Sequence, residues 1–423
     1  MARDREWEDG VRRTPPFGFA TGRGSAWSSC VLAAGLLIAS PPSAVHGAAS
    51  KPAAKSAVQG KAKPAAPRQS YEKYEKEAEA YWQSVVDKRR IRIAKRGHNV
   101  PIQLEDYVLT QPPLYTGSKP RRPRLPSFPG VPRIPVVADV LTAASERHGF
   151  VPERPDSEQT FKQAYAKAAL AAGITADQAI RIYAFETGGN GAYDVQAGLT
   201  HPSRKARAIS PAVGYNQLLI TNSIGLLAAH GDRFIETLRH RAAGLSGDAK
   251  QAMEKKLAAT QRMIAFCRSV RYHWVEHDKL AKTTRSGIAV HAALLDIDLG
   301  PLLQTQKLVD SIKFAVSQGH AAPLTGAELE MMNFTGDGNG IDLVTMPEAM
   351  RPQVPTSNFF QRGGYDRNPI ARRTAVVSAL YAALDARMDR ASQLPGAVEL
   401  AAAFAAAAER PLESGGVLEA VAQ

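Results

Sequence analysis

The chain has 423 residues, of which 44% are hydrophobic and 22% charged, so it holds enough apolar sequence for one sizeable globular domain with additional segments. The formal net charge is +13, and most of it lies between residues 51 and 133, where 18 lysines and arginines face 7 aspartates and glutamates. The two cysteines are Cys30 and Cys267. Because Cys30 lies within a predicted leader, this composition excludes a disulfide-stabilised fold for the mature protein.

Residues 1–49 are typical of a secretory signal peptide. Arginines precede an apolar run at residues 31–39, and small residues follow that run. The run is too short to cross a bilayer as an ordinary helix, and we expect no transmembrane span. The sequence therefore predicts an exported protein with a periplasmic location.

Residues 50–135 form a basic region rich in alanine, lysine and proline, which we expect to be a linker containing one helix from Tyr71 to Lys95. Proline is dense at residues 111–135 and favours extended chain there. The basic run at residues 88–96 is typical of contact with a polyanion. Because we expect export, we interpret it as attraction to an anionic envelope surface or as a solvated helix face. We expect no nucleic-acid partner.

Residues 136–394 have the pattern of a mainly α domain without sustained strand alternation. One helix is expected from a cap at Asp156 or Ser157 to Ala172, and another begins after Thr175. Further helices are expected at residues 215–230, 233–243, 248–280, 288–295, 302–318, 326–332 and 370–393. We expect the Ala-rich residues 395–423 to be a tail beyond this domain.

The helix after Thr175 ends in a glutamate followed by glycines. Glu186 falls in its last turn, and Gly188, Gly189 and Gly191 come next. The partial negative charge of a helix C-terminus and apolar neighbours both raise a carboxyl pKa. An acid that keeps its proton near neutral pH suits general-acid cleavage of a glycosidic bond, and the glycines would leave room for a polymer. The alternative is that Glu186 is a solvated surface residue and that the glycines only terminate the helix.

Two later segments extend this pattern. Residues 210–217 read Ser-Pro-Ala-Val-Gly-Tyr-Asn-Gln, and residues 333–336 read Asn-Phe-Thr-Gly. In this order after Glu186-Thr187, they resemble the catalytic domain of the soluble, goose-lysozyme-like lytic transglycosylases. The resemblance covers roughly residues 160–345. The chain departs from the family in a longer loop after Glu186, in Tyr-Asn where Leu-Met is usual, and in a long interval before Asn333 that indicates a helical insertion.

The resemblance implies a lysozyme-like helical fold and an activity. Family members cleave the β-1,4 bond between N-acetylmuramic acid and N-acetylglucosamine of peptidoglycan and leave 1,6-anhydro ends. Glu186 would be the single acid and base, because a sugar hydroxyl rather than water attacks. No second acid stands close to Glu186 in the sequence motif. The residues implied in binding the glycan are Ser210, Tyr215, Asn216, Gln217 and Asn333.

Two alternatives stay open. In a hydrolytic muramidase, Asp194 could position water, although an Asp in such a loop more often ties the backbone. A non-catalytic peptidoglycan-binding or envelope-assembly protein could also use the same fold.

We expect no cofactor and no metal. His273 and His277 lie one helical turn apart but lack a third ligand. Residues 337–342 lack the spacing of a calcium loop, and we expect an ordinary loop there. Cys267 is expected to be a packed core residue rather than a catalytic thiol.

Overall fold

The computed structural model describes residues 71–117, 128–199 and 207–409. The predicted signal peptide, Cys30 and part of the proline-dense segment lie outside these residues. Within them the protein is mainly helical and has isolated β-bridges but no strand, which confirms the predicted mainly α class.

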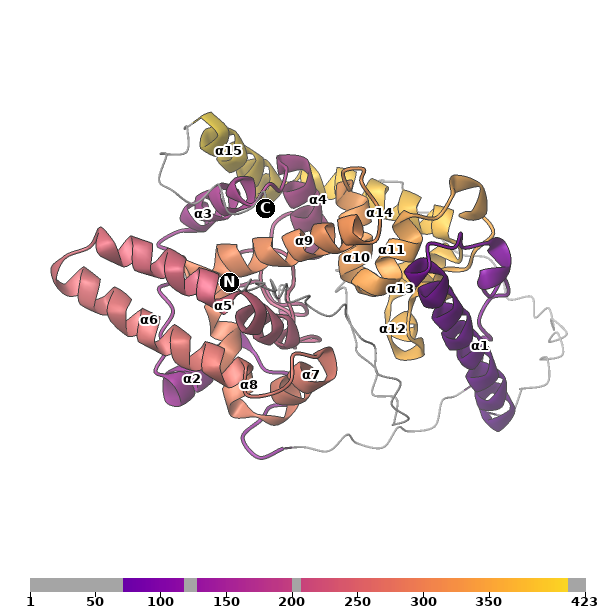
Figure 1. Cartoon of the computed structure of the whole chain (residues 1–423), viewed down its shortest axis with the longest axis horizontal. Coiled ribbons are helices and arrows are strands. Elements are labelled where there is room, and N and C mark those ends of the chain that lie inside the picture. The colour runs from indigo at the N-terminus through magenta and orange to yellow at the C-terminus, as the bar shows by residue number, and fades with distance from the viewer. Residues whose placement is uncertain (1–70, 118–127, 200–206, 410–423) are drawn as a thin grey trace, which may run out of the picture.

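Fifteen α-helices are present in the described part of the chain (Figure 1). Their bounds are α1 Tyr71–Gly97, α2 Val137–His148, α3 Glu158–Ala171, α4 Ala176–Thr187, α5 Ile220–Ala243, α6 Gly247–Cys267, α7 Trp274–Thr283, α8 Arg285–Val290, α9 Leu299–Ser317, α10 Gly326–Thr335, α11 Asp337–Val344, α12 Arg362–Arg367, α13 Pro369–Thr374, α14 Val377–Ser392 and α15 Pro395–Glu409. Short 3₁₀ helices lie at Leu104–Asp106, His291–Leu295, Glu348–Met350 and Thr356–Phe359.

The helix starts predicted from capping residues are confirmed. The side chain of Ser157 accepts a hydrogen bond from the backbone N–H of Thr160 at the start of α3. Thr175 and Gln178 form a reciprocal capping box at the start of α4. The two helices that lead to Glu186 therefore begin where local sequence chemistry requires.

Several other predicted boundaries are wrong. The expected break near Gly231 does not occur, and α5 continues through this residue. The glycine instead allows close packing of α6 on α5, because a Cβ at this position would lie 2.7 Å from Ile264 Cγ1. The expected helix at 248–280 divides after Cys267, and α7 begins only at the His273 cap. The expected helix at 370–393 also divides, into α13 and α14.

Three buried apolar clusters hold the helices together. One joins α2, α5, α6 and α8, a second joins α3, α4, α9 and α15, and a third joins α1, α10, α11 and α14. In Figure 1, α9 runs across the middle of the molecule between the α5–α6 hairpin on one side and α10, α11 and α14 on the other. Helix α9 therefore links the two sides of the protein.

The Ala-rich segment after residue 394 is part of the fold rather than a free tail as far as residue 409. Leu400 and Phe404 of α15 are buried in the cluster that contains α3 and α4. The backbone N–H of Ala397 also donates to Gly189 O at 2.9 Å, directly after the end of α4. The domain boundary expected at 394 therefore lies too early.

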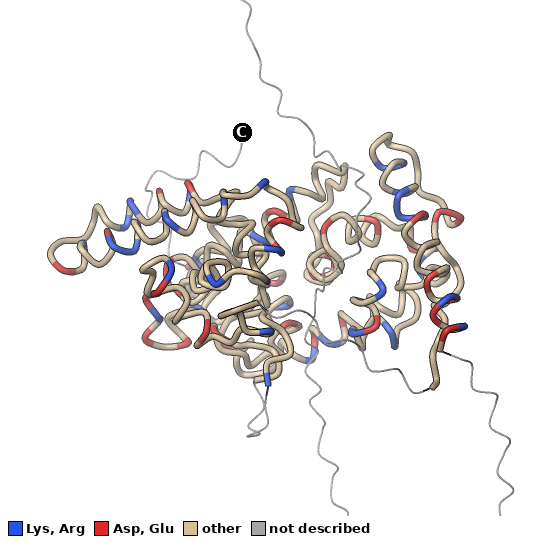
Figure 2. The backbone as a smooth tube through the Cα atoms, turned by 90° about the horizontal axis from the view of Figure 1, so that it is seen from below, with Lys and Arg blue, Asp and Glu red and all other residues tan. Residues whose placement is uncertain are grey.

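Helix α1 is likewise part of the folded body and not a linker. Arg92 is 0% exposed and its Nε lies 3.0 Å from Asp342 Oδ2 of α11, and Arg96 bonds the same carboxylate. Lys95 binds Asp106 at 2.6 Å, and Arg89 donates to two backbone carbonyls. Acidic and basic residues lie close together at the α1 end of the molecule (Figure 2). Arg92, Lys95 and Arg96 are thus paired with carboxylates inside the protein, whereas Arg90 is exposed, and contact of the basic region with an anionic surface stays a prediction.

Among the described residues, no single helix is long and apolar enough to cross a membrane. Two consecutive helical segments, Arg285–Leu295 and Leu299–Ser317, are long and apolar enough only when taken together, and the chain bends by 97° between them.

Candidate active site

Glu186 is buried at the end of α4, with 6% of the residue exposed. This excludes the alternative of a solvated surface glutamate. Gly188 ends the helix in the left-handed region, with φ of 70°, as a helix-terminating glycine does. A Cβ at Gly189 would lie 2.2 Å from Ala391 O, so that glycine permits close packing against the end of α14. The expectation that the glycines keep the surface open is therefore corrected to helix termination and packing.

A cavity of about 170 Å³ opens in front of Glu186. Its lining residues come from α4, the start of α5, α7, α9, α10 and α11, and they are Glu186, Gln217, Leu219, Asn222, Trp274, Lys307, Asn333, Gly336 and Asp337. Three residues that the sequence analysis selected, Glu186, Gln217 and Asn333, therefore meet at one cavity.

Asn333 reaches Glu186 from the last turn of α10, which packs against α4. Its Nδ2 donates a hydrogen bond to Glu186 Oε1 at 3.3 Å. Oε1 of Glu186 therefore has an N–H donor, whereas Oε2 is buried and receives no hydrogen bond from the protein.

Gln217 enters the cavity from a tight turn rather than from a helix. Val213 and Leu218 exchange two backbone hydrogen bonds of 3.1 Å, and Gln217 closes the turn with φ of 43°. Its Nε2 donates to Val195 O and Gly214 O, at 3.0 and 2.9 Å. Its Oε1 is buried and has no hydrogen-bond partner in the protein.

The neighbouring residues of the same motif turn away from the cavity. Tyr215 is 0% exposed, and its ring packs edge-on against the rings of Tyr165 and Tyr183. Asn216 accepts from Tyr165 and donates to the backbone of Gln304. The prediction that these two residues contact sugar rings is corrected to a role in holding the turn.

Ser210 and Asp194 also lie outside the cavity lining. Ser210 is buried, and its hydroxyl accepts from the backbone N–H of Ala212 at 3.2 Å. Arg154 holds Asp194 at 2.5 Å. Asp194 therefore has a structural role, but through an ion pair with the Arg154 side chain rather than through the backbone of its loop, and Ser210 supports the Ser-Pro turn.

The sequence analysis missed Glu330, which lies on α10 one turn before Asn333. Its carboxyl group is within hydrogen-bonding reach of Glu186, and the residue is 0% exposed. The statement that no second acid stands close to Glu186 is therefore wrong in three dimensions. The three-residue spacing to Asn333 was a usable signal, because it places both side chains on one helix face.

Burial raises the pKa of Glu186 to about 7, and the hydrogen bond with Glu330 and the positive charge of Arg387 keep it from rising further. Burial also raises the pKa of Glu330 well above its ordinary value, and the negative charge of an ionised Glu186 raises it again. Two interacting carboxyls of this kind release their protons as a pair. Burial therefore favours a proton on the pair.

Arg387 of α14 places a positive charge near Glu186 and Glu330. The sequence gave no reason to choose this residue. Its Nη2 donates to Phe185 O at 2.8 Å, which satisfies one of the free carbonyls at the end of α4. Its guanidinium lies 4.4 Å from the centre of the Phe185 ring. Arg387 thus places positive charge beside Glu186 without forming a direct ion pair with it.

The cavity lining contains a second carboxylate, Asp337. Asp337 begins α11 and accepts from Ser311 at 2.7 Å, and Lys307 of α9 lies 3.2 Å from its Oδ1. The loop expected at 337–342 is therefore the start of a helix. Trp274, at the start of α7, adds an aromatic ring to the lining. Lys307 and Trp274 both belong to the interval that the sequence analysis took as an insertion.

In the described residues, no three His, Cys, Asp or Glu side chains are grouped so that they could hold a metal ion. His273 caps α7 through its ring nitrogen, and His277 is buried. Cys267 is also buried, and burial raises the pKa of its thiol. The buried, protonated thiol fits the predicted packing role.

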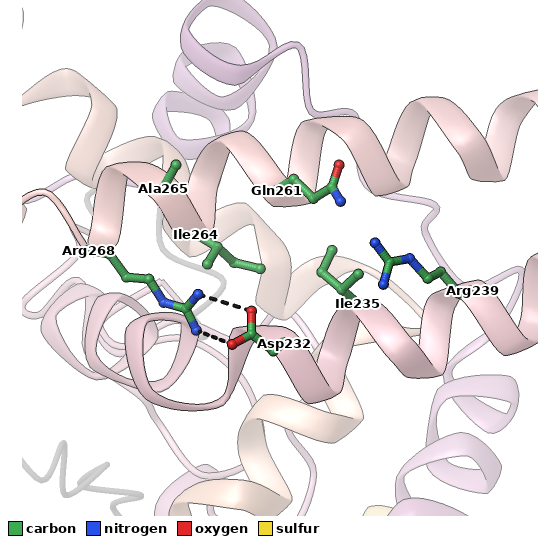
Figure 3. Close-up of a pocket in the computed structure, with 7 residues that line it drawn as sticks. All are labelled: Asp232, Ile235, Arg239, Gln261, Ile264, Ala265 and Arg268. Carbon is green, nitrogen blue, oxygen red and sulfur yellow. Dashed lines mark hydrogen bonds and ion pairs between the residues drawn. The ribbon is translucent and has the colours of Figure 1, made fainter.

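A larger hollow of about 550 Å³ lies between α5 and α6 (Figure 3). Its one carboxylate, Asp232, is held by both terminal nitrogens of Arg268, at 3.0 and 2.9 Å. The remaining polar groups in its lining are Arg239 and Gln261. The only carboxylate of this hollow is paired with Arg268 and its lining holds no nucleophile, so the smaller cavity at Glu186 is the better candidate for chemistry.

Comparisons of the chain with protein-family models, with curated proteins and with solved structures found no match.

Proposed function

We propose that the protein is a peptidoglycan lytic transglycosylase in which Glu186 is the catalytic acid and base. The observation that carries the proposal is a buried carboxylic acid at the end of α4 that opens on a cavity, where burial raises its pKa and favours the protonated form. A lysozyme-like helical fold and an exported, periplasmic location are parts of the same proposal.

The chemistry follows from the protonation state of Glu186. The acid gives its proton to the bridging oxygen between two sugars, and the glycosidic bond breaks. The resulting carboxylate then accepts the proton of the muramoyl 6-hydroxyl as that oxygen closes on C1 to form the 1,6-anhydro ring. Glu186 returns to its acid form, so one group serves both steps.

The polar groups of the lining support a sugar ligand. Asn333 orients the acid through Oε1, and the unpartnered Oε1 of Gln217 can accept from a sugar hydroxyl or amide. Trp274 supplies an aromatic face of the kind that packs on sugar rings. The proposed partner is the glycan strand, and contact of the basic region with an anionic envelope surface is a further part of the proposal.

Hydrolysis is the second candidate, and Asp337 favours it. This carboxylate lines the same cavity as Glu186 and is held in place by Lys307 and Ser311. Ordinary glycosidases need such a second carboxylate to activate water or to attack the sugar. In this case Asp337, and not Asp194, would be the second catalytic group.

Analysis of the products separates the candidates. Purified sacculi are digested with the protein, and the released muropeptides are identified by mass spectrometry. We expect 1,6-anhydromuramic acid ends from the wild type and from Asp337→Asn. Reducing muramic acid ends that disappear in Asp337→Asn would establish hydrolysis instead. Binding to sacculi without any product would support the non-catalytic alternative.

A further inference from the structure

We propose that Glu330 is a permanently protonated acid that donates a hydrogen bond to Glu186, and that it positions and stabilises the carboxylate formed when Glu186 gives up its proton. The inference concerns the same site and rests on the proposed function. Glu330 does not line the cavity, so it is a positioning residue rather than a catalytic one.

The hydrogen-bonding inventory requires a proton between the two carboxyls. Both oxygens of Glu330 and Oε2 of Glu186 are buried and none of them meets the geometry of a hydrogen bond from the protein, although the Asn333 amide lies near enough to Glu330 to lower its pKa. An ionised carboxylate can only accept hydrogen bonds, so two ionised groups in this position would face each other with three unsatisfied oxygens. A proton on one of them supplies the missing donor and removes the repulsion between like charges.

Burial decides which carboxyl keeps that proton. Glu330 is fully enclosed, whereas Glu186 reaches the cavity. The charged groups around the pair are Arg387 and Arg390 on α14, with Lys307 and Asp337 in the cavity lining. Lys307 and Asp337 neutralise each other, and Arg387 is bonded to Phe185 O beside Glu186. A negative charge is therefore better tolerated on Glu186, and the proton stays on Glu330.

This arrangement fits both steps of the proposed reaction. When Glu186 protonates the leaving oxygen, the O–H of Glu330 and the N–H of Asn333 both donate to the new carboxylate. When Glu186 takes the proton of the 6-hydroxyl, it becomes neutral again. Glu330 keeps its own proton throughout, so the proton count balances without any further reactant.

A pair of substitutions separates hydrogen bonding from space filling. Glu330→Gln imitates a neutral acid and keeps an N–H donor, whereas Glu330→Met has similar length and no donor. We expect Glu330→Gln to retain kcat and the pH profile within about threefold. We expect Glu330→Met to lower kcat about 10- to 100-fold and to move the pH profile upward, because a hydrogen bond to a charged group is lost. Equal losses in both variants, or none in Glu330→Met, would overturn the proposal.

An infrared titration tests the proton itself without relying on activity. We expect a protonated-carboxyl C=O band that persists at pH 8 in the wild type, is lost in Glu330→Gln, and is unchanged in the surface control Glu236→Gln. A wild type without this band at pH 8 would overturn the role of Glu330, whatever the sacculus digestion shows. If the band is present but no glycan is cleaved, the proposed function fails while the proton assignment stands.

Discussion

Asn333 Nδ2 donates a hydrogen bond of 3.3 Å to Glu186 Oε1, although 147 positions separate the two residues. The contact depends on the packing of α10 against α4, which also brings Glu330 to the same carboxyl. A single helix face therefore supplies both the amide and the acid that surround Glu186.

Removing the amide should weaken catalysis without unfolding the protein. We expect Asn333→Ala to lower kcat by about 10-fold, because a hydrogen bond to a group that becomes charged contributes roughly 1.5–3 kcal/mol and solvent replaces part of it. Steady-state kinetics on a soluble glycan fragment measures the effect. Asn339→Ala, on α11 and outside the cavity lining, is the control and should retain full activity. Equal rates in the two variants would contradict the role of Asn333.

The buried acid pair should make stability fall as pH rises. Glu330 has its pKa raised in the folded state above the ordinary value of 4.5. Its stability contribution is therefore complete below pH 4.5 and is lost as pH rises through the folded-state pKa. Glu330→Gln removes this titration. We expect its free energy of unfolding to exceed that of the wild type by a margin that grows about 1.4 kcal/mol per pH unit as pH rises from 4.5 towards the folded-state pKa.

Urea unfolding at several pH values measures this margin. Glu236→Gln, an exposed glutamate of α5, should show no such growth. A constant difference between Glu330→Gln and the wild type from pH 5 to pH 8 would mean that Glu330 titrates normally.

The two glycines after Glu186 should differ in their sensitivity to alanine. Gly188 has φ of 70° and open space at its Cβ position, so Gly188→Ala should cost about 1–2 kcal/mol of stability. At Gly189 the Cβ would also meet Ala391 O at 2.2 Å, and we expect a cost of more than 3 kcal/mol. Thermal unfolding compares them, and a Gly189→Ala variant as stable as Gly188→Ala would contradict the packing described here.

Substitutions of Trp274 and Tyr215 should have different effects on substrate binding and on stability. We expect Trp274→Ala to raise KM about 10-fold at unchanged stability, because the ring lines the cavity. Tyr215→Phe should instead leave KM unchanged and lower stability by about 1–2 kcal/mol, because its buried hydroxyl bonds Glu158. Kinetics and thermal unfolding of both variants make the comparison. A raised KM in Tyr215→Phe would restore the sugar-contact role expected from the sequence.

The buried ion pair of α1 should be essential for docking that helix. Arg92→Met leaves Asp342 buried with Arg96 as its remaining cation, and we expect a loss of about 3–5 kcal/mol. The exposed Arg90→Met should change stability by less than about 0.5 kcal/mol. Chemical denaturation measures both. Similar small effects would mean that α1 is not held by this pair.

Local sequence chemistry predicted the part of the site that one segment determines. Thr175 and Gln178 fix the start of α4, so the position of Glu186 in its last turn followed from the cap. The burial of Glu186 could not be derived in the same way, because α10 and α14 cover it from distant parts of the chain.

The predictions that were wrong have the same physical origin, namely contacts between distant parts of the chain. Tyr215 occupies a motif position that suggested sugar contact, but the left-handed turn at Gln217 sends the tyrosine into the aromatic cluster. The charges of α1 were visible in the sequence, whereas their partner Asp342 lies about 250 positions later, a separation that charge patterns do not reveal.

The most direct test of the central claim is the rate at which the protein releases soluble fragments from purified sacculi, compared with the rate of a folded Glu186→Gln variant. The account predicts release of fragments with anhydro ends by the wild type, and none by the variant at equal thermal stability. Turnover by Glu186→Gln at a rate close to that of the wild type would contradict it.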